Sequence, residues 1–213
     1  MHIQLEIEQI IPNDEISVML DKEFKKGSIE IGYLQRSCDN KNIAHAQIYD
    51  HTETRFSIPR QVFLVCHGTT GAAVQNTVTT NNNLYRHADV QYIQVKIDNE
   101  LYPNLQQNGK FLENQYSRFY QEFISSCRNI GGECSISSKE FRDLYTIFSV
   151  NLSQQAEKLN NRVTNFSLRL FRNVVPDVNT NPLNPRELEI FIIILNEKKI
   201  KIDVIKQSVE EIN

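Results

Sequence analysis

The sequence predicts an all-β protein, a jelly-roll β-sandwich of about eight strands with one inserted short helix at about residues 112–127. Apolar residues alternate with polar ones along most of the chain, which is the period of a half-buried strand. The 213 residues include 24 Ile and 19 Phe and Tyr but only 7 Gly, and β-branched and aromatic residues favour strands. Loops of uneven length separate the alternating segments, as in sandwiches and jelly rolls.

Strand candidates extend over the whole length of the sequence. In the first, Ile3, Leu5 and Ile7 alternate with polar residues, so that one face is apolar and the other wet. The stretch from Val62 to Val65 is apolar throughout, which suits a strand buried on both faces. The other candidates, in order, are residues 29–34, 44–58, 90–97, 144–152, 163–171, 188–195 and 199–205.

One segment has helical periodicity. Leu112, Tyr116, Phe119 and Phe123 recur at helical spacing, and Gly131-Gly132 is a suitable stop. We expect this to be the only helix of more than two turns, resting on a sheet edge or covering an end of the sandwich.

The remaining segments are predicted to be loops and turns. Residues 175–187 contain three prolines and form an exposed loop, since proline cannot donate to a sheet ladder. Residues 76–87 are a second polar loop, and Asn196-Glu197-Lys198 is expected to be a hairpin turn. The sequence shows neither a repeat nor a linker, so we expect one jelly-roll domain over residues 1–213.

Composition restricts the function classes. A net charge of −3 provides no basic surface for direct nucleic-acid binding. The first residues have no basic leader, and no stretch approaches 18 apolar residues, so neither secretion nor a membrane span is expected. The four cysteines, Cys38, Cys66, Cys127 and Cys134, have no regular spacing. We interpret them as free thiols of a protein inside the cell.

The most suggestive chemical feature is the pair Cys66-His67, where an apolar strand enters a Gly-Thr-Thr-Gly turn. Neighbouring residues on a strand point to opposite faces, so this thiol and imidazole cannot form a catalytic dyad with each other. His45, His51 or His87 could supply a base, but no motif selects one of them. We therefore expect Cys66 to be a buried residue at a strand end.

Metal and acid–base sites are also weakly supported. Cys127 and Cys134 are seven positions apart without a CxxC or HxxxH partner, and His45 and His51 lie too far apart along one strand.

Carboxylate pairs give no acid–base site either. Glu6/Glu8 and Glu187/Glu189 alternate with apolar residues as on a solvated strand face, and Glu210-Glu211 belongs to a solvated tail. Phosphate-loop, nucleophile-elbow and kinase motifs do not occur. We expect no enzyme activity, and we assign no catalytic, cofactor-binding or metal-binding residue.

The order of these signals resembles a known family. The strand SIPRQVFLV (57–65) precedes an Asn-rich loop, and a later strand ends in a turn with Asp98, Asn99 and Pro103. A helix with spaced tyrosines follows, and then the strand YTIFSVNL (145–152). This succession is similar to the C-terminal jelly roll of the double-jelly-roll major capsid proteins of polinton-like and adintovirus-like elements and virophages. It covers residues 57–203 well and the first 56 loosely, and the chain departs from it in the longer loop 177–186.

The resemblance implies a capsid-like structural protein that acts by self-assembly, as a trimer or hexamer, or by pairing with another jelly-roll protein. It implies a place in a virion or in the host-cell interior. Two alternatives belong to another class. One is a lectin-like module that grips a sugar with loop 80–84, Tyr85, Tyr92 and Tyr102. The other is a domesticated capsid-derived interaction protein.

Overall fold

The computed structural model describes residues 13–25, 27–44, 48–55, 58–68, 84–98, 100–153, 164–173, 187–203 and 208–212. The chain divides into two compact units, one made of Met1–Tyr33 with Lys198–Asn213 and the other of Leu34–Glu197. The sandwich core lies in the second unit. The expectation of one domain over residues 1–213 stays a prediction.

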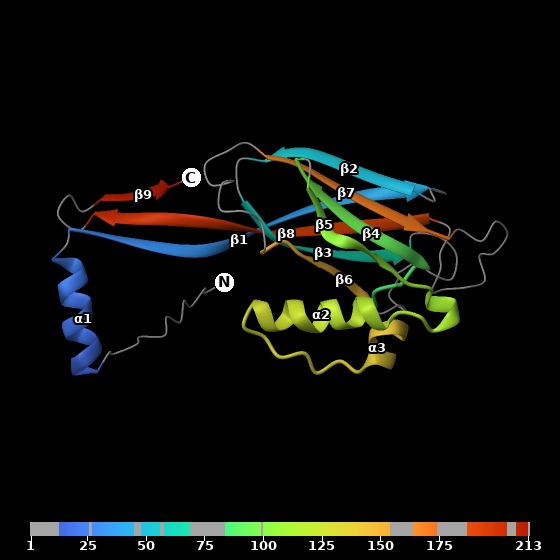
Figure 1. The fold of residues 1–213 in the computed structure, drawn as a ribbon, viewed down its shortest axis with the longest axis horizontal. Helices are drawn as coiled ribbons and strands as arrows, with labels where there is room; N and C mark the ends of the chain where they lie inside the picture. The colour runs from blue at the N-terminus through green and yellow to red at the C-terminus, as the bar shows by residue number, and fades with distance from the viewer. Residues whose placement is uncertain are drawn as a thin grey trace, which may run out of the picture. The chain divides into compact units, whose positions relative to one another are not determined.

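Two β-sheets make up the fold (Figure 1). In spatial order, the first contains β1 (Ser28–Ala44), β8 (Glu187–Asp203), β3 (Ile58–Gly68) and β6 (Ile147–Asn151). The second contains β2 (Ile48–Arg55), β7 (Thr164–Arg172), β4 (Val90–Ile97) and β5 (Glu100–Asn108). The ninth strand, β9 (Ser208–Ile212), pairs antiparallel with the last residues of β8.

The strand order is that of a jelly roll. The first eight strands pair like one long hairpin, β1 with β8, β2 with β7, β3 with β6 and β4 with β5. Wrapping this ribbon around the core adds two further pairs, β8 with β3 and β7 with β4, and divides it into two sheets. Eight antiparallel strands wound in this way define the jelly roll. The predicted fold class is confirmed.

The core follows the alternation of the sequence. On β4, Ile93, Val95 and Ile97 are buried, whereas the residues between them are more exposed. Residues of β8 and β7 complete the interior, with Ile192 and Leu168 both 0% exposed. Each such side chain contributes about 1.5–3 kcal/mol through burial alone.

The predicted helix is present but begins later than expected. A short 3-10 turn, η2 (Phe111–Glu113), precedes α2 (Ser117–Asn129). Between them, Asn114 has a left-handed conformation with φ of 59°, which interrupts the helix. Leu112, expected in the apolar stripe, belongs to η2 and is 53% exposed, while Phe119 and Phe123 of α2 are buried.

As expected, α2 lies against a sheet edge (Figure 1). It packs beside β6, and its Glu122 carboxylate accepts a hydrogen bond of 3.2 Å from the backbone N–H of Asn151. An uncovered edge strand would offer free N–H groups to other chains, so α2 protects this edge.

The expectation of a single longer helix is wrong. An 11-residue helix, α1 (Asp14–Phe24), belongs to the first unit. Asn13 caps it by accepting a hydrogen bond of 2.9 Å from the backbone N–H of Ile16, and two acidic residues occupy its first turn. A third, shorter helix, α3 (Ser138–Asp143), follows α2. Both starts have N-cap signals that apolar periodicity does not reveal.

The expectation of a hairpin turn at residues 196–198 is also wrong. The 17-residue strand β8 continues through these residues to Asp203. Side chains of the neighbouring strands β1 and β3 bind the polar residues of this part of β8. Asn196 is buried and donates a hydrogen bond of 3.4 Å to the Ser37 hydroxyl, and Glu197 forms an ion pair with Arg60 of β3. The expected first strand, residues 2–10, and the proline-rich loop lie outside the described residues.

Candidate functional site

Cys66 and His67 leave β3 on opposite sides, as expected for neighbours on a strand. Cys66 is fully buried, and burial raises the pKa of its thiol to about 12, although the charge of Arg172 acts in the opposite direction. His67 is half-buried between aromatic rings, with ring centroids 5.2 Å from Tyr85 and 5.3 Å from Phe191. A buried thiol that stays protonated at neutral pH is a packing residue and a poor nucleophile.

The other histidines do not join Cys66 in a site. His87 is buried against Phe111, and its Nδ1 accepts a hydrogen bond of 2.9 Å from the backbone N–H of Asp89. His51 lies on β2, with its Nε2 3.9 Å from a carboxylate oxygen of Asp39. His45 lies outside the described residues.

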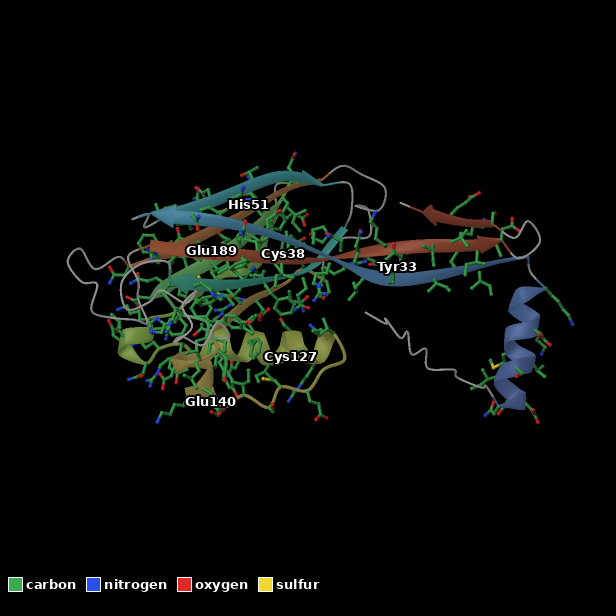
Figure 2. The ribbon with its side chains drawn as sticks, turned by 180° about the vertical axis from the view of Figure 1, so that it is seen from behind. Tyr33, Cys38, His51, Cys127, Glu140 and Glu189 are labelled. Carbon is green, nitrogen blue, oxygen red and sulfur yellow. The ribbon has the colours of Figure 1, made fainter. Side chains whose placement is uncertain are left out.

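The structure describes two of the carboxylates expected to be solvated, Glu189 and Glu210. Glu210 is exposed, but the expected tail is wrong, because this residue lies in β9 and pairs with Lys201 of β8. Glu189 on β8 accepts a hydrogen bond of 3.0 Å from the side-chain amide of exposed Asn40 (Figure 2). Glu6 and Glu8 lie outside the part of the chain that the structure describes. Within that part, no group of three or more His, Cys, Asp or Glu side chains could hold a metal ion.

The tyrosines proposed for a sugar site are separated. Tyr102 is buried and donates a hydrogen bond of 2.6 Å to Glu100, while Tyr85 packs on His67. Tyr92 lies on the outer face of the second sheet, whereas Tyr85 contacts His67 of β3 in the first sheet. The first four residues of the Asn-rich loop 80–84 fall outside the described residues.

An outward-facing row crosses the second sheet, which we call the outer row: Ile48, Phe171 and Tyr92. The three are cross-strand neighbours on β2, β7 and β4. Tyr92 and Phe171 stack with ring centroids 5.3 Å apart and planes 12° apart, and Ile48 is 55% exposed. Sequence analysis missed this row because its members come from distant parts of the chain and only the strand register aligns them.

A cavity of about 410 Å³ opens beside the outer row. Tyr92 and Phe171 line it together with Lys110 and the amide residues Asn108 and Gln115. Lys110 is already paired, with its Nζ 3.0 Å from a carboxylate oxygen of Glu113. The cavity lining thus combines aromatic residues with neutral amide residues.

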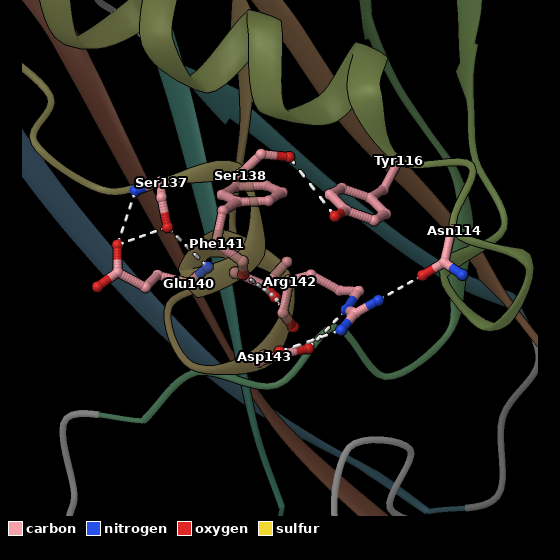
Figure 3. Close-up of polar contacts among 9 residues, drawn as sticks. Asn114, Tyr116, Ser137, Ser138, Glu140, Phe141, Arg142 and Asp143 are labelled. Carbon is pink, nitrogen blue, oxygen red and sulfur yellow. Dashed lines mark hydrogen bonds and ion pairs between the residues drawn. The ribbon is translucent and has the colours of Figure 1, made fainter.

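A polar cluster ties α3 to the turn before α2 (Figure 3). Arg142 donates hydrogen bonds to the carboxylate of Asp143, at 2.5 and 3.1 Å, and to the Asn114 side chain. Its guanidinium also lies 5.9 Å from the centre of the Tyr116 ring. These contacts hold two helical segments together, which is a structural role.

In the described part of the chain, no helix is long and apolar enough to cross a membrane. No family model and no curated protein sequence matches this chain.

Solved structures do share the fold. A chain of the Sputnik virophage, solved by cryo-EM, superposes with a TM-score of 0.51 at 13% sequence identity over 87% of this chain. The fold is shared with a virophage particle protein. The mavirus major capsid protein superposes with a TM-score of 0.46 at 9% identity over 87% of this chain. PBCV-1 VP54, fitted into a reconstruction of Sputnik, gives 0.47 at 9% identity over 91% of this chain.

This chain spans only part of those proteins, namely 39%, 41% and 53% of their lengths. The likeness to virophage capsid proteins expected from the sequence is confirmed as a likeness of fold.

Proposed function

We propose that this chain is a capsid-like structural protein that acts by packing its jelly roll against other jelly rolls. The observation that carries the proposal is the fold shared with a Sputnik virophage chain, of which this chain spans 39%. A jelly roll that builds a shell packs against neighbours, either copies of itself in a trimer or hexamer or a separate partner roll. The virion, or the host-cell interior where it assembles, is the corresponding location.

The outer row supports the proposal, because exposed apolar groups on a sheet face are suited to burial against a neighbour. Ile48, Phe171 and Tyr92 offer such a strip on the second sheet, whereas the β6 edge is covered by α2. The role is geometric, so no residue is assigned a catalytic part. The contact segments expected from the sequence, residues 3–10 and 176–185, lie outside the described residues.

Light scattering after size exclusion, with electron microscopy of the same sample, tests the proposal. We expect an oligomer at micromolar protein that Ile48→Lys weakens. Ile130→Lys is the matched control, because Ile130 is exposed to 47%, near the 55% of Ile48, but follows α2, which packs on β6 of the first sheet. A strictly monomeric protein that forms no shell with or without a partner roll would contradict the proposal.

A second function, glycan binding, is favoured by the cavity beside Tyr92. A lining of aromatic and amide residues suits a neutral, hydroxyl-rich ring, and the volume of about 410 Å³ falls within the usual range for small-ligand sites. A monomer that is retained on a glycan column, with retention lost in Tyr92→Ala, would favour this function over shell building.

A further inference from the structure

Two of the four cysteines meet at the C-terminal end of α2. Cys127 lies in the last turn of the helix (Figure 2), and Cys134 follows the Gly131-Gly132 turn. The Cys134 side chain lies against the last turns of α2, where it lines a cavity with Tyr120, Ile124 and Arg128, and it is a neighbour of Cys127. Both residues also pack on the hydrophobic core, so their positions are held by more than their contact with each other.

Backbone geometry brings the two thiols together. Gly131 has a φ of +80°, a left-handed conformation that reverses the chain at the helix end. The N–H of Gly132 then donates to the carbonyl oxygen of Cys127 at 2.9 Å. Beyond Cys134, the carbonyl of Ile136 accepts a hydrogen bond of 2.8 Å from the Tyr120 hydroxyl. The segment that carries Cys134 is therefore fixed to α2 on both sides.

The two thiols differ in their access to solvent. Burial raises the pKa of Cys127, and the charge of Cys134 and its hydrogen bond act in the same direction. Cys134 lines a surface cavity of about 620 Å³ together with Tyr120 and Arg128, so a small reagent reaches it from solvent.

We propose that Cys127 and Cys134 are a modification site, at which a low-molecular-weight disulfide oxidises the pair to an intramolecular disulfide. The Cys134 thiolate attacks one sulfur of the small disulfide and releases the first small thiol. The Cys127 thiolate then attacks the Cys134 sulfur in the mixed disulfide and releases the second. The two thiol protons end on the released small thiols, and the two electrons reduce the small disulfide.

The bond would lock α2 in place. It would tie the last turn of the helix to the segment that leads to α3, and α2 is the element that covers the β6 edge. Small disulfides are scarce in reducing compartments and persist outside them, so the lock would close when the protein leaves a reducing compartment. The site does not depend on shell building.

The two other cysteines provide controls. Cys38 is exposed on β1, and Cys66 is sealed in the core (Figure 2 shows Cys38 and Cys127 on separate elements). The experiment therefore uses folded protein with Cys38→Ser, treated with oxidised glutathione and then analysed by intact mass and non-reducing peptide mapping. We expect the loss of two hydrogens per chain, one cross-link between Cys127 and Cys134, and slower amide exchange in the last turn of α2.

Single substitutions separate the two steps. In Cys127→Ser the reaction should stop at one glutathione adduct on Cys134, because the resolving thiol is missing. In Cys134→Ser the adduct on Cys127 should form more slowly. Circular dichroism checks that both variants are folded. Folded protein that retains both thiols, or that cross-links Cys127 or Cys134 to another cysteine, would overturn the proposal.

Discussion

His87 stacks on Phe111 with ring centroids 4.7 Å apart and ring planes 3° apart. The imidazole is buried, and its Nδ1 accepts the hydrogen bond from the Asp89 backbone, so this nitrogen must be unprotonated. Burial lowers the pKa of His87 from 6.5 to about 4, and the nearby charge of Arg142 acts in the same direction. The fold therefore requires a neutral histidine at this position.

Stability should fall with acid because of His87. The folded protein holds the pKa of this histidine below its unfolded value, so the contribution is fully present above pH 6.5 and is lost as the pH falls towards 4. The full difference corresponds to about 3 kcal/mol. Urea unfolding at pH 7.5 and pH 4.5, followed by circular dichroism because the chain lacks tryptophan, measures it.

His87→Asn is the control for that experiment. Its side-chain oxygen can accept the same hydrogen bond from Asp89 but does not titrate. We expect this variant to be less stable at pH 7.5, with a smaller loss on acidification. Equal losses in both proteins would show that His87 is not the group responsible.

Gly109 is predicted to tolerate no side chain. A Cβ at this position would lie 2.5 Å from Cε2 of Phe119 and 2.9 Å from the carbonyl oxygen of Gln115. Phe119 is fully packed and cannot retreat easily, so Gly109→Ala should lower the free energy of unfolding by about 1–3 kcal/mol. The control is Gly32→Ala, where a Cβ would meet nothing within 4 Å, and its effect should stay within about 0.5 kcal/mol.

The strands that form the core were predictable from the sequence, because a half-buried strand has alternating apolar and polar residues. Val62 to Val65 of β3, the alternation on β4 and the run on β8 all appear where they were expected. The sequence did not predict the β5 strand, because Pro103 and several Asn and Gln residues interrupt the apolar alternation there. Among the strands that the structure describes, it pairs with β4 alone at a sheet edge, and an edge position tolerates such residues.

The surface was less predictable than the core. The burial of Cys66 could be inferred from its strand alone. In contrast, the stacking of Tyr92 on Phe171 and the meeting of Cys127 with Cys134 depend on register and on a helix end, which a one-dimensional pattern does not contain. The ion pair that keeps β8 extended through Glu197 requires Arg60 from a distant strand.

Cys66 should not react with thiol reagents in the folded protein. It has no exposed surface, and burial raises its pKa to about 12, so thiol reagents should label it only on unfolding. Cys66→Ala should cost about 1–2 kcal/mol through the cavity left behind, without changing the oligomeric state. Labelling of Cys66 in native buffer at the rate of exposed Cys38 would contradict this.

A capping box formed by Ser137 and Glu140 begins α3. The Ser137 hydroxyl accepts a hydrogen bond of 3.2 Å from the Glu140 N–H, and the Glu140 carboxylate accepts one of 2.8 Å from the Ser137 N–H. The hydrogen bonds from Ser137 also lower the pKa of Glu140. This capping box fixes the short helix that carries Phe141, which is 0% exposed, into the core.

Ser137→Ala should therefore lower the free energy of unfolding by about 1 kcal/mol and raise the pKa of Glu140 towards its ordinary value. Ser137→Asn retains an acceptor and should recover most of the loss. Ser138→Ala is the matched control, since this neighbouring hydroxyl makes only a 3.5 Å contact with the Tyr116 hydroxyl. Denaturation curves and a carboxyl NMR titration measure both effects. If the Glu140 pKa is the same in Ser137→Ala as in the parent protein, the capping box does not hold α3, and packing of Phe141 alone fixes the helix.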